Sequence, residues 1–132
     1  MMYLPDTEAD RLLEEARLAS MHSYSPYSEF VVGAAVLTEG GLIYHGTNIE
    51  NASFGLTICA ERIALGNVLS AGLKDIVAIA VYADTDSVSP CGACRQFIIE
   101  FGANIIVIFR QDQKVVQKYI HELLPYQFKM PA

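Results

Sequence analysis

An uninterrupted apolar run in the middle of the chain constrains the fold more than any other segment. Residues 76–83, Ile-Val-Ala-Ile-Ala-Val-Tyr-Ala, contain no charged side chain. A strand of this composition is buried on both faces of its sheet, which is typical of a central, parallel strand. We therefore expect helices to cover both sides of the sheet that contains it.

The segments around this run supply the other elements. Thr7 begins a helix-start signal just after Pro5, and Gly72 and Gly102 each follow a predicted helix as a stop. Residues 39–41, Glu-Gly-Gly, predict a hairpin turn. We expect helices at about 7–19, 59–71, 91–101 and 119–124, and strands at about 30–37, 42–48, 104–109 and 114–117. This order predicts a three-layer α/β/α sandwich with a mixed five-stranded sheet, formed by residues 1–132 as a single domain.

Composition and charge narrow the functional classes. The apolar share is 52% and the charged share 18%, which is typical of a globular domain with its own core. No apolar run reaches the roughly 20 residues of a membrane-spanning helix, and residues 1–11 lack the pattern of a secretory signal, so we expect a cytoplasmic protein. A net charge of −6 with only nine Lys and Arg argues against nucleic-acid or membrane partners and favours a small-molecule substrate.

The three cysteines form the most informative pattern. Their odd number in a chain that looks cytosolic argues against a disulfide framework. Cys59 and the pair Cys91 and Cys94 all fall at predicted helix starts. The partial positive charge and free N–H groups of a helix N-terminus favour thiolate, the form that binds metal. Two such helix starts side by side would present three thiolates to one zinc ion.

Three interpretations of this trio remain open. A closed structural zinc site would need His22, His45 or His121 as its fourth ligand. A redox Cys-X-X-Cys pair would leave Cys59 without a role. An open catalytic site would have three protein ligands and a water molecule.

Two neighbours of Cys59 favour the catalytic interpretation. A carboxylate at Glu61 could take a proton from a metal-bound water and return it to a reacting nitrogen. Three thiolates on a divalent cation leave a net charge of −1, which weakens the metal as a Lewis acid. We expect Arg62 to offset this charge by hydrogen-bonding to the sulfurs.

The segments 59–62, Cys-Ala-Glu-Arg, and 90–96, Pro-Cys-Gly-Ala-Cys-Arg-Gln, resemble the zinc signature of the small cytidine deaminases. Further segments resemble that family in the same order, at 24–28, 30, 32–35, 48–51 and 123–125. The resemblance extends from about residue 22 to residue 128. It implies a cytidine deaminase-like fold and one Zn²⁺ per subunit.

The resemblance also implies a reaction. In the family, a zinc-held hydroxide attacks C4 of cytidine or 2′-deoxycytidine, giving uridine or 2′-deoxyuridine and ammonia in pyrimidine salvage. Glu61 would carry protons to N3 and to the departing amine. The N–H groups of Ala60 and Cys91 match positions that contact the base and the hydrated intermediate.

Substrate contacts and assembly follow from the same resemblance. Asn48 and Glu50 match the ribose-binding residues, and Phe30 would pack against the sugar or base. A carboxylate near the ribose would repel a 5′-phosphate, so nucleosides should be preferred over nucleotides. Phe128 matches an aromatic residue that stacks on the base in a neighbouring subunit's site, which implies a homotetramer with sites at subunit borders.

Two positions depart from the family pattern. Phe54 stands where tyrosine is common, which removes a hydroxyl, and Thr47 stands where a non-ligand cysteine is frequent. Two alternative functions remain open: deamination of a related cytosine compound such as blasticidin S, and a non-catalytic, zinc-stabilised binding module. Nucleic-acid editing is disfavoured because the chain is acidic and shows no basic, aromatic-rich strand channel.

Overall fold

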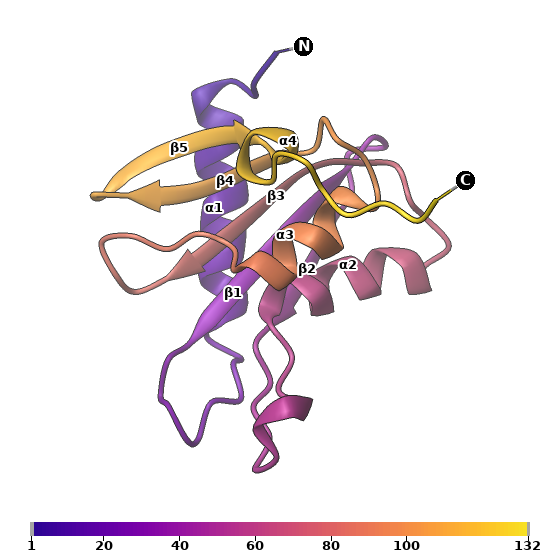
Figure 1. Cartoon of the computed structure of the whole chain (residues 1–132). Coiled ribbons are helices and arrows are strands. Elements are labelled where there is room, and N and C mark those ends of the chain that lie inside the picture. The colour runs from indigo at the N-terminus through magenta and orange to yellow at the C-terminus, as the bar shows by residue number, and fades with distance from the viewer. Residues whose placement is uncertain (1, 132) are drawn as a thin grey trace.

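The computed structural model describes residues 2–131 and contains a five-stranded sheet with helices on both faces (Figure 1). The helices are α1 (Asp6–Ser20), α2 (Ala60–Ser70), α3 (Gly92–Ile99) and α4 (Ile120–Leu123), with a 3-10 turn at Phe54–Leu56. The strands are β1 (Val32–Thr38), β2 (Ile43–Thr47), β3 (Ile76–Ala83), β4 (Ile106–Gln111) and β5 (Lys114–Tyr119). No helix within residues 2–131 is long and apolar enough to cross a membrane.

The strand order β2-β1-β3-β4-β5 places β3 at the centre of the sheet. β3 pairs in parallel with β4 and antiparallel with β1, and the β1–β2 and β4–β5 pairs are antiparallel. The sheet is therefore mixed, with a single parallel pair at the position of the apolar run. Figure 1 shows α1 on one side of the sheet and α2 and α3 on the other, which confirms the predicted three-layer architecture.

Alternating side chains on the strands divide the core into two parts. On β3, Ala78 and Ala80 face α1, whereas Ile79 faces α2 and α3. This alternation is the period-two geometry of a strand, and both of its faces are apolar because both are covered. The α1 side contains Ala9, Leu12, Leu13, Ala16, Ala35, Ala78, Ala80, Ile106 and Ile108. The opposite side contains Ala34, Val36, Ala60, Ala64, Leu65, Val68, Ile79, Ile98, Ile99, Ile105, Val107, Phe109 and Ile120.

Two glycines allow a helix to approach the sheet closely. A Cβ at Gly33 of β1 would lie 2.0 Å from the carbonyl oxygen of Ala16 in α1. A Cβ at Gly46 of β2 would lie 2.3 Å from the backbone nitrogen of Ala64 in α2. Neither distance leaves room for a side chain, so glycine is required for this packing. Gly46 thus determines how near the first turns of α2 lie to the sheet.

Some predicted boundaries were wrong by one or two residues. Thr7 lies inside α1, whose N-cap is Pro5, and the Pro5 carbonyl accepts the first helical bonds at 3.0 Å from the N–H groups of Glu8 and Ala9. The strand predicted from residue 30 begins at Val32, because the backbone carbonyl of Phe30 bonds to the Asn48 side chain instead of a neighbouring strand. Helix boundaries are sensitive to such local alternatives.

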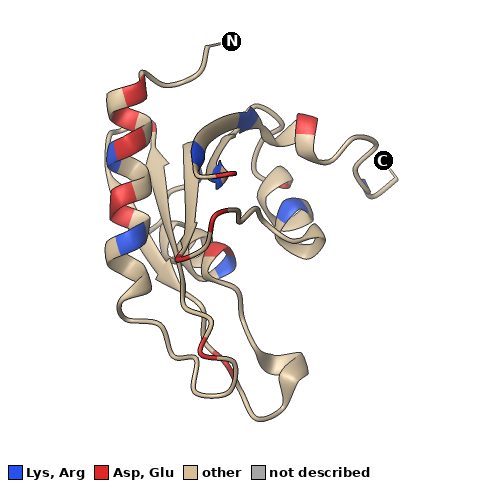
Figure 2. Ribbon diagram, turned by 90° about the vertical axis from the view of Figure 1, so that its left-hand side faces the viewer, with Lys and Arg blue, Asp and Glu red and all other residues tan. Residues whose placement is uncertain are grey.

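Acidic residues are concentrated in α1, whose ribbon carries several red segments in Figure 2. They are Asp6, Glu8, Asp10, Glu14 and Glu15, none of which is buried. Arg17 Nε donates to Glu14 Oε2 at 2.8 Å and Arg17 Nη2 donates to Glu14 Oε1 at 2.6 Å. The buried face of the same helix is apolar, so α1 has the two-faced pattern of a helix that covers one side of a sheet.

Candidate metal centre

The N-termini of two helices bring the three cysteines together. Cys59 is the N-cap residue of α2, Cys91 is the N-cap residue of α3, and Cys94 lies in the first turn of α3. Their sulfur atoms all lie within 4.8 Å of one another. A tetrahedral zinc ion with bonds of about 2.3 Å would require sulfurs roughly 3.8 Å apart, so small side-chain movements suffice for binding.

Exposure differs among the three sulfur ligands. Cys94 is buried, Cys59 is half-buried and Cys91 is exposed, and all three are free thiols. The cluster is therefore open to solvent on the side of Cys91. An open side is what a substrate or water would need in order to reach a metal held by these residues.

The thiols influence one another's ionisation. A hydrogen bond from the Cys94 thiol, together with one from Arg62, lowers the pKa of Cys59 to about 5. The pKa of Cys94 is raised, because its proton is held in that hydrogen bond to Cys59 and because the side chain is buried. The cluster thus holds a thiolate at neutral pH before any metal binds, which is a favourable starting state for a zinc site.

Glu61 lies in the first turn of α2 and is only 5% exposed. Burial raises the pKa of its carboxyl, and the negative charge of Cys59 adds to the effect. A buried carboxyl group with a raised pKa, next to candidate metal ligands, is suited to general acid and base catalysis. The structure places this group beside the sulfur cluster.

Arg62 extends from α2 toward the sulfurs. Its Nη2 donates a hydrogen bond to Cys59 Sγ at 3.6 Å, and its pKa is raised by that bond and by the charge on the sulfurs. Its Nε is buried and has no partner among the described residues. The guanidinium is therefore held next to the cluster by one bond, with a further donor available there.

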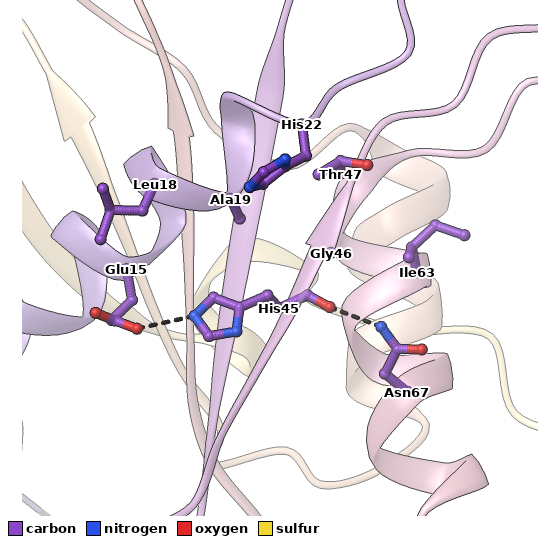
Figure 3. Close-up of a pocket in the computed structure, with 9 residues that line it drawn as sticks. All are labelled: Glu15, Leu18, Ala19, His22, His45, Gly46, Thr47, Ile63 and Asn67. Atoms are coloured by element: carbon purple, nitrogen blue, oxygen red, sulfur yellow. Dashed lines mark hydrogen bonds and ion pairs between the residues drawn. The ribbon is translucent and has the colours of Figure 1, made fainter.

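The histidines considered as a fourth ligand lie apart from the cluster. Within residues 2–131, the group able to hold a metal consists of the three cysteines, without a histidine. His45 Nε2 lies 2.8 Å from Glu15 Oε1, in a cleft of about 430 Å³ beside β2 that His22 also lines (Figure 3). His121 stacks on Tyr119. A closed Cys₃His structural site is therefore not formed.

The Asn48 side chain is hydrogen-bonded to the loop at residues 23–32. Its Nδ2 donates to the Phe30 carbonyl at 2.7 Å, and its Oδ1 accepts from the Val32 N–H at 3.0 Å and from the Ser23 hydroxyl. Only one N–H of the amide remains for a ligand. Asn48 is only 9% exposed, so it contributes to the structure of this loop.

Glu50 is bonded to the same loop from the other side. Its Oε1 accepts from the N–H groups of Tyr27 and Ser28 at 2.9 and 3.1 Å, and its Oε2 accepts from the Ser28 hydroxyl. These bonds, the hydroxyl bond first, lower the pKa of Glu50. Isolated bridges from Ile49 to Tyr24 and to Ile58 join the segments around it (lower part of Figure 1).

The remaining predicted contacts lie at the surface or in the α2 backbone. The side chains of Phe30 and Phe128 are 46% and 68% exposed. Ala60 is the first residue of α2, where the N–H has no partner within the helix. Phe54 is 77% exposed and packs edge-on against Tyr27, with ring centroids 6.4 Å apart.

The structure also contains contacts that sequence reasoning missed. The Gln96 side chain pairs with the backbone of Phe128, donating to its carbonyl at 3.0 Å and accepting from its N–H at 3.3 Å. Ser28 joins Glu50 to Phe30, since its hydroxyl also accepts from the Phe30 N–H at 3.0 Å. Gln96 and Phe128 are far apart in the sequence, so no local pattern indicates their contact.

The fold and the site together define a zinc-binding α/β/α domain with a buried acid beside its metal ligands. Residues 6–110 match the family described as the cytidine and deoxycytidylate deaminase zinc-binding region. The chain belongs to this family. The sulfur cluster, with its thiolate and its open side, fits one zinc ion.

Comparisons with individual proteins agree with this assignment. A cytidine deaminase of Halalkalibacterium halodurans is 50% identical over 120 residues, covering 89% of this chain and 91% of the relative. The crystal structure of cytidine deaminase from Burkholderia pseudomallei matches with a TM-score of 0.85 and 44% identity, covering 90% of this chain and 98% of that one. A blasticidin-S deaminase of Bacillus cereus is 36% identical over 106 residues, covering 74% of this chain and 76% of the relative.

Proposed function

We propose that the chain is a zinc-dependent deaminase that converts cytidine and 2′-deoxycytidine to uridine and 2′-deoxyuridine and releases ammonia. One observation carries the proposal: three sulfurs converge within 4.8 Å beside a carboxylic acid that is 5% exposed. The relatives named cytidine deaminase support the choice of substrate.

The residues around the cluster have distinct roles in this proposal. Cys59, Cys91 and Cys94 would hold zinc, which would supply a Lewis acid that makes a water molecule more acidic. Glu61 accepts a proton from the attacking water and delivers protons to N3 and to the leaving amine. Burial strengthens this role, because a raised pKa favours the protonated form of the acid.

Backbone donors favour the tetrahedral species. The N–H of Ala60 points from the start of α2 and that of Cys91 from the start of α3. Donors fixed by helix geometry before the reaction need no rearrangement when charge develops on the substrate. We assign these two groups to contacts with the base and the hydrated intermediate.

The sugar is assigned to the loops next to the cluster. Glu50 offers a carboxylate to a ribose hydroxyl, Asn48 offers its remaining N–H, and Phe30 packs against the sugar or base. A 5′-phosphate near Glu50 would be repelled, so nucleosides are preferred over nucleotides. The Glu50 charge persists to low pH, since its hydroxyl and backbone bonds lower its pKa.

We further propose a homotetramer with sites at subunit borders, in which Phe128 stacks on the base bound in a neighbouring subunit. The 68% exposure of this aromatic side chain supports the proposal, because an isolated chain gives it little to pack against. Light scattering after size exclusion should give about four times the chain mass of 14.5 kDa. Three metal-binding thiols suit a reducing compartment, so we place the enzyme in cytoplasmic pyrimidine salvage.

The test combines metal content with turnover. Purified protein should contain one zinc per chain and give the ultraviolet change of cytidine deamination. Glu61→Gln should retain zinc and lose turnover by about 10²-fold or more. Glu8→Gln is the matched control, because Glu8 lies in the first turn of α1 as Glu61 does in that of α2, but is exposed. Zinc without turnover would instead identify a zinc-stabilised binding module.

A second candidate reaction is deamination of blasticidin S, which the relative from Bacillus cereus favours. Both substrates present an aminopyrimidine to the metal and differ in what is attached to it. Competition of equal concentrations of cytidine and blasticidin S for one enzyme sample would give the ratio of their kcat/KM values directly. A ratio in favour of blasticidin S would replace the primary proposal.

A further inference from the structure

Ser28 connects two residues that are assigned to the sugar. Its hydroxyl donates to Glu50 Oε2 and accepts from the Phe30 N–H at 3.0 Å. Its own N–H donates to Glu50 Oε1 at 3.1 Å. One exposed serine therefore holds a carboxylate on one side and the backbone of an aromatic residue on the other.

The bonds to Glu50 are distributed unevenly between its oxygens. Oε1 accepts two backbone N–H groups, from Tyr27 and Ser28, whereas Oε2 accepts only the Ser28 hydroxyl. Each carboxylate oxygen has about two acceptor directions, so Oε1 is saturated and Oε2 keeps one. The two backbone N–H groups thus leave Oε2 as the oxygen that can still receive a donor from a ligand, and the Ser28 hydroxyl restricts the direction from which that donor can approach.

The backbone around Ser28 is built for this arrangement. Glu29 has a φ of 58°, and its N–H bonds to the Ser25 carbonyl at 2.9 Å, which closes a tight turn. This turn directs the N–H groups of Tyr27 and Ser28 at one carboxylate oxygen. A non-glycine residue in the left-handed region is uncommon and needs such support from its surroundings.

We propose that Ser28 is a positioning residue for substrate specificity, which fixes Glu50 and Phe30 so that the free acceptor of Glu50 Oε2 receives a sugar hydroxyl. This inference rests on the proposed function, because it takes Glu50 and Phe30 to be the sugar contacts. Ser28 itself acts through these two residues and not on the reacting atoms.

Paired substrates provide the test. We measure kinetics with cytidine and with 2′,3′-dideoxycytidine, which lacks the 2′- and 3′-hydroxyls that could donate a hydrogen bond to Glu50. The proteins compared are wild type, Ser28→Ala, Ser28→Thr and Glu50→Gln. Ser28→Ala should raise KM for cytidine about tenfold, the usual effect of losing a hydrogen bond to a charged group, with kcat within about twofold. The same substitution should change KM for the dideoxynucleoside by less than about twofold. Ser28→Thr retains the hydroxyl and should restore the cytidine KM.

Two further comparisons make the test specific. The double variant Ser28→Ala/Glu50→Gln should be no worse with cytidine than Glu50→Gln alone, because both changes remove the same contact. Ser53→Ala is the control: Ser53 is an exposed serine of the adjacent loop whose hydroxyl makes no hydrogen bond within the described residues, and its kinetics should match wild type.

The outcomes separate the inference from the proposed function. An equal loss with both substrates, or additive losses in the double variant, would overturn the role of Ser28 while deamination stands. Absence of cytidine turnover by zinc-loaded wild type would overturn the proposed function, and the inference with it. A Ser28→Thr variant as impaired as Ser28→Ala would also count against the hydroxyl as the active feature.

Discussion

Arg62 Nη2 donates a hydrogen bond to Cys59 Sγ at 3.6 Å, which places a guanidinium charge against a thiolate that is ionised at neutral pH. The two residues lie one turn apart at the start of α2. Cys59 is a candidate metal ligand, whereas Arg62 is a neighbour that contacts this ligand and would not bind the metal itself. Contacts of this kind tune the affinity and acidity of a bound metal.

Replacement of Arg62 by Gln should weaken zinc binding or turnover without unfolding the chain. The removed charge no longer offsets the three thiolates, and loss of a contact to a metal ligand typically reduces affinity or activity by about 10- to 100-fold. Zinc retention against a chelator and kcat with cytidine provide the measurements. Arg17→Gln is the control, because Arg17 forms an exposed pair with Glu14 on α1. Unchanged kinetics and metal content in Arg62→Gln would contradict the charge-compensation role.

The thiolate character of Cys59 should be visible in the metal-free protein. Its pKa of about 5 predicts that alkylation by iodoacetamide follows a titration with a midpoint near that pH, measured by mass spectrometry of the Cys59 peptide. Cys94→Ala removes the hydrogen bond that contributes most to the low pKa. The midpoint should then move up toward the ordinary thiol value of 9.0. A midpoint that stays near 5 in this variant would assign the effect to Arg62 instead.

Stability of the metal-free protein should depend on pH through Glu61. Burial raises the pKa of this carboxyl above its ordinary value of 4.5. At pH values between 4.5 and this raised pKa, the folded chain retains a proton that the unfolded chain has released. The free energy of unfolding therefore falls as pH rises through this range. Glu61→Gln removes this contribution, and urea unfolding should show a smaller decline above pH 4.5 than in wild type.

The difference in free energy of unfolding between wild type and Glu61→Gln, taken at each pH, isolates the contribution of Glu61. The pKa values of Glu14, Glu50 and Glu122 are lowered, so these groups lose their stabilising contribution as pH falls through their folded-state values. They are present in both proteins and cancel in the difference. Parallel stability curves would contradict the raised pKa of Glu61.

Gly46→Ala should destabilise the fold and disturb the metal centre together. The new Cβ would lie 2.3 Å from the Ala64 backbone nitrogen, so α2 must move away from β2 and carry Cys59 with it. Overpacking of this kind costs about 1–3 kcal/mol, measurable by urea unfolding, and zinc affinity should fall in the same variant.

Gly66→Ala provides the matched control within α2. A Cβ there meets nothing within 4 Å, and alanine is the better helix former by up to about 1 kcal/mol. This variant should therefore be as stable as wild type or more so, with unchanged zinc affinity. Equal destabilisation by both substitutions would show that close packing at Gly46 is not the cause.

Much of the fold follows from local sequence pattern. The apolar run at 76–83 became β3 with the predicted bounds, and Gly72 ends its helix at a φ of 85°, a conformation in which glycine is favoured. The helix starts at Cys59 and Cys91 were correct to one residue. These features depend on neighbours within one or two turns, which is why periodicity and stop signals could predict them.

The contacts of Asn48 and Glu50 could not be worked out in the same way. Asn48 and Glu50 were assigned by resemblance, and the sequence contains no local sign that both hold the loop from Ser23 to Val32. Ser28 lies 22 residues from Glu50, and Gln96 lies 32 residues from Phe128. Such pairs form only when separate loops are brought side by side, so pattern within a short window does not report them.

The sequence by itself determined the kinds of side chain at the site and the helix starts that carry them, because thiols, an acid and an arginine within single helical turns keep fixed relative positions in any fold. Tertiary structure alone decided that Cys59 meets Cys91 and Cys94, since packing of α2 and α3 on one face of the sheet brings the two helix N-termini together. It also decided that the histidines stay outside the cluster. Local helix geometry fixes which side chains lie together on each helical turn. Burial of the apolar core fixes which helical turns face one another.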